Sequence, residues 1–316
     1  MMEKKDLRIV FMGTPEFAVA SLKALVEDNY NVVAVVTQPD KPVGRHGSVL
    51  QASQVKQYAI EHSIPVLQPE KMKNEEFVEQ LRSYHADLQV VVAFRMLPEV
   101  VWAMPRFGTF NVHASLLPQY RGAAPINWAI INGETETGVT TFFLDHEIDT
   151  GRIILQEKMP IASTDDVGIV YDKLMTMGAE ICKQTVNLVI EKGHDIPTQP
   201  QPNSIVPLHP APKIFKETCR IDWSQEPKRI YDFIRGLSPY PGAWTMLTDS
   251  DGREQQLKIY KAELLTTRQP DNQTTKQLNG LPQGLQLIEV QLAGKKRMSM
   301  SDFLNGLHGE YKVNIL

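Results

Sequence analysis

The sequence predicts an α/β fold in which a doubly wound sheet is followed by a smaller, β-rich domain. Leu7–Met12 is predicted as a buried strand. Asn31–Thr37 is a second strand, and its interior from Val32 to Val36 is apolar throughout, as parallel strands are when helices cover both faces of their sheet. An amphipathic helix expected over Phe17–Glu27 joins these two strands into a βαβ unit. Six prolines between Pro197 and Pro212 preclude a helix there and predict an extended linker before the second domain.

Length and charge restrict the class of protein. A chain of 316 residues favours one domain of about 200 residues and a smaller one. The net charge of −4 excludes a generally basic nucleic-acid-binding protein. Residues 207–316 nevertheless carry 15 basic and 12 acidic side chains, a net charge of +3 against −7 for the remainder. This asymmetry either helps to orient a polyanion or reflects chance variation of the surface.

The cysteines and the apolar runs predict the cellular compartment of the protein. Cys182 and Cys219 lie far apart and outside any CxxC pattern, which argues against a disulfide framework and a structural zinc site. Residues 1–6 lead directly into a strand without the features of a signal peptide. No apolar run approaches the roughly 18 residues of a membrane span. We expect a soluble, cytoplasmic protein with no membrane contact and no metal.

Between residues 13 and 103 the predicted helices and strands alternate. Gly13 is alone in the first βα turn, and the missing GxGxxG pattern argues against dinucleotide binding. Residues 38–51 form a polar loop that is long enough to have a function. Helices are then expected over Ser53–His62, Asn74–Tyr84 and Pro98–Ala103, with strands over Pro65–Leu67 and Leu88–Phe94.

The later part of the chain begins with a hairpin-like pair of strands. Strands are expected over Gly138–Leu144 and Arg152–Met159, which enclose a polar loop. A long amphipathic helix is expected over Asp165–Ile190. After the prolines, a short helix over Lys228–Gly236 precedes strands over Trp244–Thr248, Leu257–Leu264, Gly284–Glu289 and from Gln291 onward.

Residues 109–126 combine the end of a strand with a polar loop. Side chains alternate along a strand, so Asn111 and His113 share one face and Val112 points to the other. Gly122 closes the loop, and Pro125 suits the first turn of the following helix. In open α/β sheets, ligands bind outside the carboxyl ends of the strands. We therefore expect a site where this strand meets its loop.

Asn111, His113 and Asp149 carry the chemistry that we expect of this site. An amide donates hydrogen bonds to an oxyanion, and an imidazole donates or moves a proton. A carboxylate in a nearby loop orients the imidazole or takes a proton through water. Together the three groups fit acyl transfer by direct attack of an amine on a carbonyl, without a covalent nucleophile.

Each of these residues also has a plainer interpretation. Asn111 and His113 can form a structural pair, and Asp149 can be a turn former. Ser115 is the rival nucleophile, but it is not in a GxSxG turn, and backbone hydrogen bonding in the loop suits it better. A metal site at His113 and Asp149 lacks a third ligand with the required spacing.

Four short motifs follow one another in a specific order. Asn111-x-His113 precedes Ser115-Leu116-Leu117-Pro118 and Arg121-Gly122, and Asp149-Thr150-Gly151 comes last. This combination resembles the folate-dependent formyltransferase family. Longer stretches over nearly the whole chain are similar to the members of that family that act on methionyl-tRNA. They cover residues 11–18, 37–42, 121–126, 220–223 and 293–296.

The resemblance implies three parts of the chain. They are a Rossmann-like formyltransferase catalytic domain over 1–192, a proline-rich linker over 193–212 and an OB-like β-barrel over 213–316 that binds tRNA. It implies 10-formyltetrahydrofolate as the formyl donor and the α-amine of initiator methionyl-tRNA as the acceptor, for translation initiation. We also expect the protein to act as a monomer.

The resemblance also implies roles for individual residues. Catalysis falls to Asn111, His113 and Asp149, folate binding to Ser115, Leu116, Leu117 and Pro118, and tRNA binding to Arg45. Residues 46–51 replace the lysines that the family usually has after this arginine. That weakens the expected electrostatic attraction between this loop and tRNA, because phosphate contacts depend on lysine and arginine.

Other functions use parts of the same pattern. A formyltransferase acting on an amino sugar nucleotide would share the three catalytic side chains, but the tail resembles the tRNA-specific members. Formylation of glycinamide ribonucleotide needs only the catalytic domain, whereas this chain has a further 110 residues from Pro207 onward. A non-catalytic RNA-binding protein would bind tRNA without turnover, and a dehydrogenase would need the GxGxxG pattern.

Overall fold

The computed structural model describes residues 2–43, 49–202, 207–249, 251–265, 278–307 and 311–313. The chain forms two compact units. The first comprises Met1–Gly122, Gly138–Met159 and Tyr171–His209, and the second comprises Ala123–Thr137, Pro160–Val170 and Pro210–Leu316. Two segments within the first 170 residues therefore belong with the C-terminal unit. The domain boundaries after residues 192 and 212 stay a prediction.

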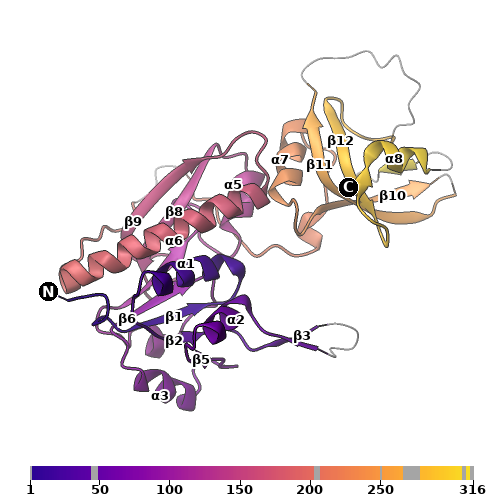
Figure 1. Ribbon diagram of the computed structural model, residues 1–316. Helices are drawn as coiled ribbons and strands as arrows, with labels where there is room; N and C mark the ends of the chain where they lie inside the picture. The colour runs from indigo at the N-terminus through magenta and orange to yellow at the C-terminus, as the bar shows by residue number, and fades with distance from the viewer. Residues whose placement is uncertain are drawn as a thin grey trace. The chain divides into compact units, whose positions relative to one another are not determined.

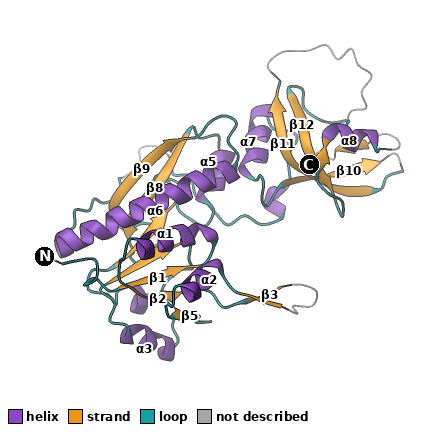
Figure 2. Ribbon diagram, in the orientation of Figure 1, coloured by secondary structure: helices purple, strands orange, loops and turns teal. Residues whose placement is uncertain are grey.

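The first unit is built on a seven-stranded sheet with the order β5-β2-β1-β6-β7-β8-β9 (Figures 1 and 2). The strands β2, β1, β6 and β7 run parallel to one another, as does β5 beside β2, whereas β8 pairs antiparallel with β7. The predicted α/β sheet is thus confirmed and is mixed at β8. The bounds are β1 Ile9–Gly13, β2 Val32–Val36, β5 Val66–Leu67, β6 Leu88–Val92, β7 Thr109–His113, β8 Glu136–Phe143 and β9 Ile153–Pro160.

Two helices of this unit begin at a residue whose side chain caps the first turn. Ser53 accepts a hydrogen bond from the Lys56 N–H, and Asn74 accepts one from the Phe77 N–H, so each caps a helix start. Phe11 of β1 is one of the largest fully buried side chains. The central strands are apolar because their side chains form this core. The helices are α1 Glu16–Glu27, α2 Gln54–Glu61, α3 Glu75–Ser83 and α4 Glu99–Trp102, with α6 Val167–Lys192 beginning in the second unit.

The polar segment at residues 38–51 differs from the prediction of a plain loop. It contains two short strands, β3 Lys41–Val43 and β4 Val49–Gln51, which pair antiparallel with Pro42 opposite Leu50. A two-stranded ribbon of this kind needs no buried face, so it leaves no apolar alternation in the sequence. Leu50 is accordingly exposed.

The second unit contains a five-stranded antiparallel sheet with the order β13-β12-β11-β10-β14. This confirms the smaller β domain. Its three long strands, β10, β11 and β12, are labelled in Figure 2. Its core includes Trp223, Leu257 and Val290. The strands are β10 Ala243–Asp249, β11 Glu254–Leu264, β12 Leu285–Leu292, β13 Met298–Ser299 and β14 Tyr311–Val313, and the helices are α5 Pro125–Ile131, α7 Pro227–Gly236 and α8 Met300–Asn305.

Two features of this unit differ from the expectation. The two strands expected over Gly284–Glu289 and from Gln291 are one strand, β12, and Val290 between them is fully buried. Helix α8 was not expected, because six residues are too few to show a helical period. Through the described part of the chain, no helix has both the length and the apolar character that a membrane crossing requires.

Candidate active site

Strand β7 presents Asn111 and His113 on one face of the sheet. Val112 belongs to the other face, because a methyl group built on Gly178 of α6 would lie 3.5 Å from its Cγ1. The alternation of a strand then places Asn111 and His113 opposite, as the sequence predicts. Across the described residues, no protein group hydrogen-bonds to the half-buried Asn111 side chain. Its amide can therefore donate to a ligand.

His113 is held by the loop that follows it. Its Nε2 lies 2.9 Å from the Tyr120 carbonyl oxygen. A carbonyl oxygen only accepts, so Nε2 carries a proton and donates it into this hydrogen bond. In the neutral ring the unprotonated nitrogen is then Nδ1, which lies 4.0 Å from Oδ2 of Asp149. The side chain is only 7% exposed, and Nδ1 is the ring nitrogen that faces the Asp149 carboxylate.

Asp149 comes from the loop between β8 and β9, and its side chain is 12% exposed. The Gly122 backbone N–H donates a hydrogen bond of 2.9 Å to Oδ2, which stabilises the ionised carboxylate. Asp149 has a φ of 56°, which aspartate tolerates better than most residues. Two residues later, Gly151 is required, because a Cβ there would lie 1.7 Å from the Phe143 carbonyl oxygen.

Residues 115–118 divide between buried and partly exposed side chains. Ser115 is fully buried and its hydroxyl donates to the Gln119 carbonyl at 2.8 Å, which confirms the backbone hydrogen bond expected of it. Leu117 packs in a small cluster with Phe142 and Ile153. Leu116 and Pro118 are half-buried. The segment is therefore anchored by two of its members and leaves apolar surface at the other two.

Sequence reasoning missed Gln201. Its carboxamide contacts both the Asp149 loop and Arg121 through four hydrogen bonds. No pattern distinguishes it from Gln199 in the same proline-rich segment. The main-chain groups that hold His113 and Asp149 were equally invisible, because backbone contacts leave no side-chain signature.

The other candidate groups lie elsewhere. Arg45, expected to bind tRNA, lies outside the described residues. Burial raises the pKa of the Cys182 thiol, which makes it a poor nucleophile.

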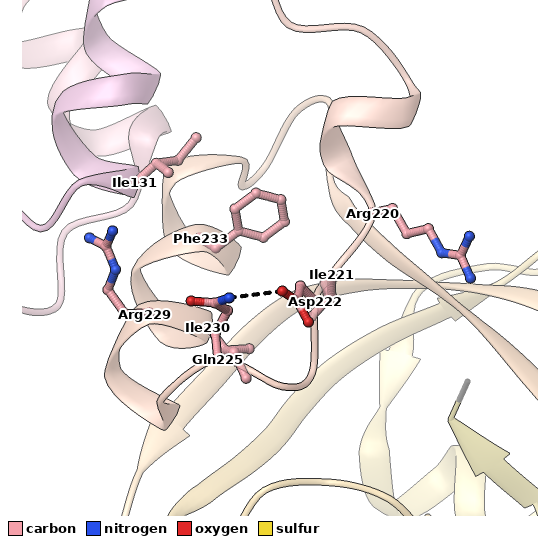
Figure 3. A pocket seen from close by; sticks show the side chains of 8 residues that line it. All are labelled: Ile131, Arg220, Ile221, Asp222, Gln225, Arg229, Ile230 and Phe233. Carbon is pink, nitrogen blue, oxygen red and sulfur yellow. Dashed lines mark hydrogen bonds between the residues drawn. The ribbon is translucent and has the colours of Figure 1, made fainter. Parts of the chain in front are cut away.

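The second unit has a cavity of about 220 Å³, lined among others by Ile131, Arg229 and Phe233 (Figure 3), and it contains none of the predicted catalytic residues. The part of the chain that is described holds no group of three histidine, cysteine, aspartate or glutamate side chains arranged for a metal ion.

Comparison with protein families places this geometry in context. The family described as "Formyl transferase" matches residues 7–186, and "Formyl transferase, C-terminal domain" matches residues 213–308. The chain belongs to the formyl transferase family. These matches confirm the predicted family. Members of this family use folate. The order of short motifs at residues 111–122 and 149–151 was sufficient to identify it.

Individual relatives within and around the formyl transferase family differ widely in identity. A protein of Parabacteroides distasonis named methionyl-tRNA formyltransferase is 61% identical, over 99% of this chain and 100% of its own. HypX of Aquifex aeolicus, solved with tetrahydrofolic acid, has a TM-score of 0.63 at 18% identity, over 96% of this chain and 48% of its own. The N-formyltransferase of Helicobacter canadensis, solved with folinic acid and dTDP-3-aminofucose, has a TM-score of 0.58 at 21% identity, over 83% and 89%. The two structures share the fold.

The proton on His113 Nε2 can be tested directly in this formyl transferase. In protein labelled with ¹⁵N-histidine at alkaline pH, where the ring is neutral, the His113 Nε2 resonance should have the shift of a protonated nitrogen and Nδ1 that of an unprotonated one. A His113→Asn variant identifies the signals by their loss. The opposite tautomer would contradict the hydrogen bond to the Tyr120 carbonyl.

Proposed function

We propose that this formyl transferase moves the formyl group of 10-formyltetrahydrofolate to the α-amine of initiator methionyl-tRNA. The supporting observation is the relative named methionyl-tRNA formyltransferase, which matches 99% of this chain and 100% of its own length. That likeness includes the C-terminal domain. The alternative acceptor, the amine of an amino sugar nucleotide, would use the same three side chains. Its support is a likeness of fold at 21% identity.

The loop after β7 fits the folate donor. Leu116 and Pro118 offer apolar surface, and Ser115 and Leu117 fix the loop that carries them. The amide of Asn111 offers a hydrogen-bond donor to the formyl oxygen. When bound, the folate supplies the formyl carbon, and its nitrogen gains a hydrogen when the group leaves. We assign the donor site to these residues.

Asn111 stabilises the charge that develops during transfer. As the amine nitrogen forms a bond to the formyl carbon, the carbonyl electron pair moves onto oxygen, and the Asn111 amide donates a hydrogen bond to that oxygen. The pair returns to re-form the carbonyl when the bond from carbon to the donor nitrogen breaks. The amine nitrogen thus exchanges one hydrogen for the formyl group, and the donor nitrogen takes up one hydrogen.

Asp149 and His113 handle these protons. An α-amine has an ordinary pKa near 7.7, so a modest base suffices to keep it neutral. The Asp149 carboxylate accepts the proton that the amine loses, directly or through water, and delivers one to the leaving nitrogen. His113 faces the carboxylate with Nδ1, and in its protonated form this N–H is directed at the same region. The Tyr120 carbonyl keeps Nε2 out of the exchange.

Substitution of the acidic and amide groups tests this assignment. Asn111→Ala and Asp149→Ala should each lower the rate of formyl transfer to methionyl-tRNA by about 10²–10³, the usual cost of removing an oxyanion donor or a catalytic base. Glu147→Ala, an exposed carboxylate in the same loop as Asp149, should leave the rate nearly unchanged. Thermal unfolding checks that all three variants fold. Near-normal turnover of both catalytic variants would refute the roles.

A basic and aromatic surface of the second unit suits tRNA. The Lys213 ammonium lies 5.4 Å from the ring of Phe215, which is 57% exposed. Lys216 and Arg220 lie 5.9 and 5.7 Å from the Trp244 ring. Lysine and arginine neutralise phosphates, and exposed rings stack on bases. We assign tRNA binding to residues 213–316 and catalysis to residues 1–192, with residues 193–212 as the linker between them. The proposed protein acts as a monomer in the cytoplasm.

The salt dependence of tRNA binding tests this surface. Lys213→Ala/Lys216→Ala should weaken binding of methionyl-tRNA and lower the slope of log affinity against log salt by about 1 to 2, since each phosphate contact contributes about 0.7–0.9. The rate of formyl transfer at saturating tRNA should equal that of the unmodified protein. Lys23→Ala/Lys73→Ala removes the same charge from exposed positions of the first unit and should leave the slope nearly unchanged. Equal slopes for the two double variants would exclude a specific contact.

A further inference from the structure

Gln201 joins two loops of the first unit through every polar atom of its side chain. Its Nε2 donates to the carbonyl oxygens of Asp149 at 2.7 Å and Gly151 at 3.0 Å. Its Oε1 accepts from Nε of Arg121 at 3.1 Å and from Nη2 at 2.6 Å. A carboxamide has two N–H groups and an oxygen with two lone pairs, so the hydrogen-bonding capacity of Gln201 is fully used.

The Asp149 loop needs such support because its backbone is not in a low-energy conformation. Asp149 has a φ of 56°, which is uncommon for a residue with a side chain even though aspartate tolerates it better than most, so contacts that hold it favour this conformation. Gln201 fixes the carbonyl of this residue, and Gly122 fixes its carboxylate. The two contacts together determine where the carboxylate lies relative to Nδ1 of His113, 4.0 Å away.

The other side of Gln201 contacts the loop after β7. Three successive residues of this loop each hold one group of the site. Tyr120 binds His113 through its carbonyl, and Arg121 binds Gln201 through its guanidinium. Gly122 binds Asp149 through its N–H. A shift of either loop would therefore change the distance between His113 and Asp149. Gln201 connects the two loops directly, in addition to the hydrogen bond from the Gly122 N–H to the Asp149 carboxylate.

The segment that carries Gln201 is itself fixed. Gln199 exchanges two backbone hydrogen bonds with Ile153 of β9, of 2.8 and 2.9 Å. The Arg152 guanidinium binds the hydroxyl and the carbonyl of Thr198 at 2.8 Å each. Gln199 and Thr198 therefore attach this segment to β9 and to Arg152 before it, and the proline-rich segment contributes to the site.

We infer that Gln201 is a positioning residue for formyl transfer, which holds the Asp149 loop and the loop after β7 in the one arrangement that directs the carboxylate at His113. The inference rests on the proposed catalytic role of Asp149. On this inference the effect of Gln201 on the rate passes through the position of that carboxylate relative to His113, so removing Gln201 should lower the turnover number and leave the Michaelis constant for tRNA nearly unchanged. A misplacement of about 1 Å can cost 10²-fold in rate.

The test is a double-mutant cycle with methionyl-tRNA and 10-formyltetrahydrofolate. Gln201→Ala should lower the turnover number about 10- to 100-fold, and in an Asp149→Ala background the same change should cost less than about threefold. Gln201→Glu keeps the acceptor for Arg121 but cannot donate to two carbonyls, so it should be similarly slow while folding normally. Gln199→Ala, whose backbone bonds remain, is the matched control and should be nearly as active as the unmodified protein.

Each outcome bears on one claim. Normal turnover of Gln201→Glu beside an inactive Asp149→Ala would overturn the inference and leave the catalytic role of Asp149 intact. An equal loss from Gln201→Ala in both backgrounds would show a role in folding or substrate binding and would also overturn it. Near-normal turnover of Asp149→Ala would refute the proposed role itself, and with it the inference that depends on it.

Discussion

The hydrogen bond from the Gly122 N–H to Oδ2 of Asp149 is the contact on which the site depends. It joins residues 27 positions apart in sequence and supplies a donor to a carboxylate that is largely withdrawn from water. An ionised carboxylate in such a place without a donor would be destabilised. The preceding residues of the same loop hold His113 and Gln201, so the geometry of this one loop fixes His113 and Asp149 relative to one another.

The order and direction of the strands bring His113 and Asp149 to the same edge of the sheet. β7 lies between the parallel strand β6 and the antiparallel strand β8, and its carboxyl end delivers His113 directly into the loop. The hairpin formed by β8 and β9 then brings Asp149 back to the same place, because Gly151 permits an approach to the Phe143 carbonyl that any side chain would block. A site outside the carboxyl ends of strands is what an open α/β sheet offers.

Much of this was predictable because it depends on periodicity. The apolar strands, the capping serine and asparagine of α2 and α3, and the shared face of Asn111 and His113 all follow from local sequence. The β3–β4 ribbon and α8 did not, since short or exposed elements carry no period. Gln201 could not be identified either, because its partners are carbonyl groups and an arginine at distant positions. Such tertiary contacts leave no trace in one sequence.

The most direct test of the account is a parallel assay with two acceptors. The protein is mixed with 10-formyltetrahydrofolate and either methionyl-initiator tRNA or an amino sugar nucleotide, and formylated product is measured in each. We predict turnover of methionyl-tRNA within the usual enzymatic range of about 1–10³ s⁻¹ and none of the sugar. Transfer to the sugar alone would contradict the acceptor, and transfer to neither would contradict the chemistry assigned to Asn111, His113 and Asp149.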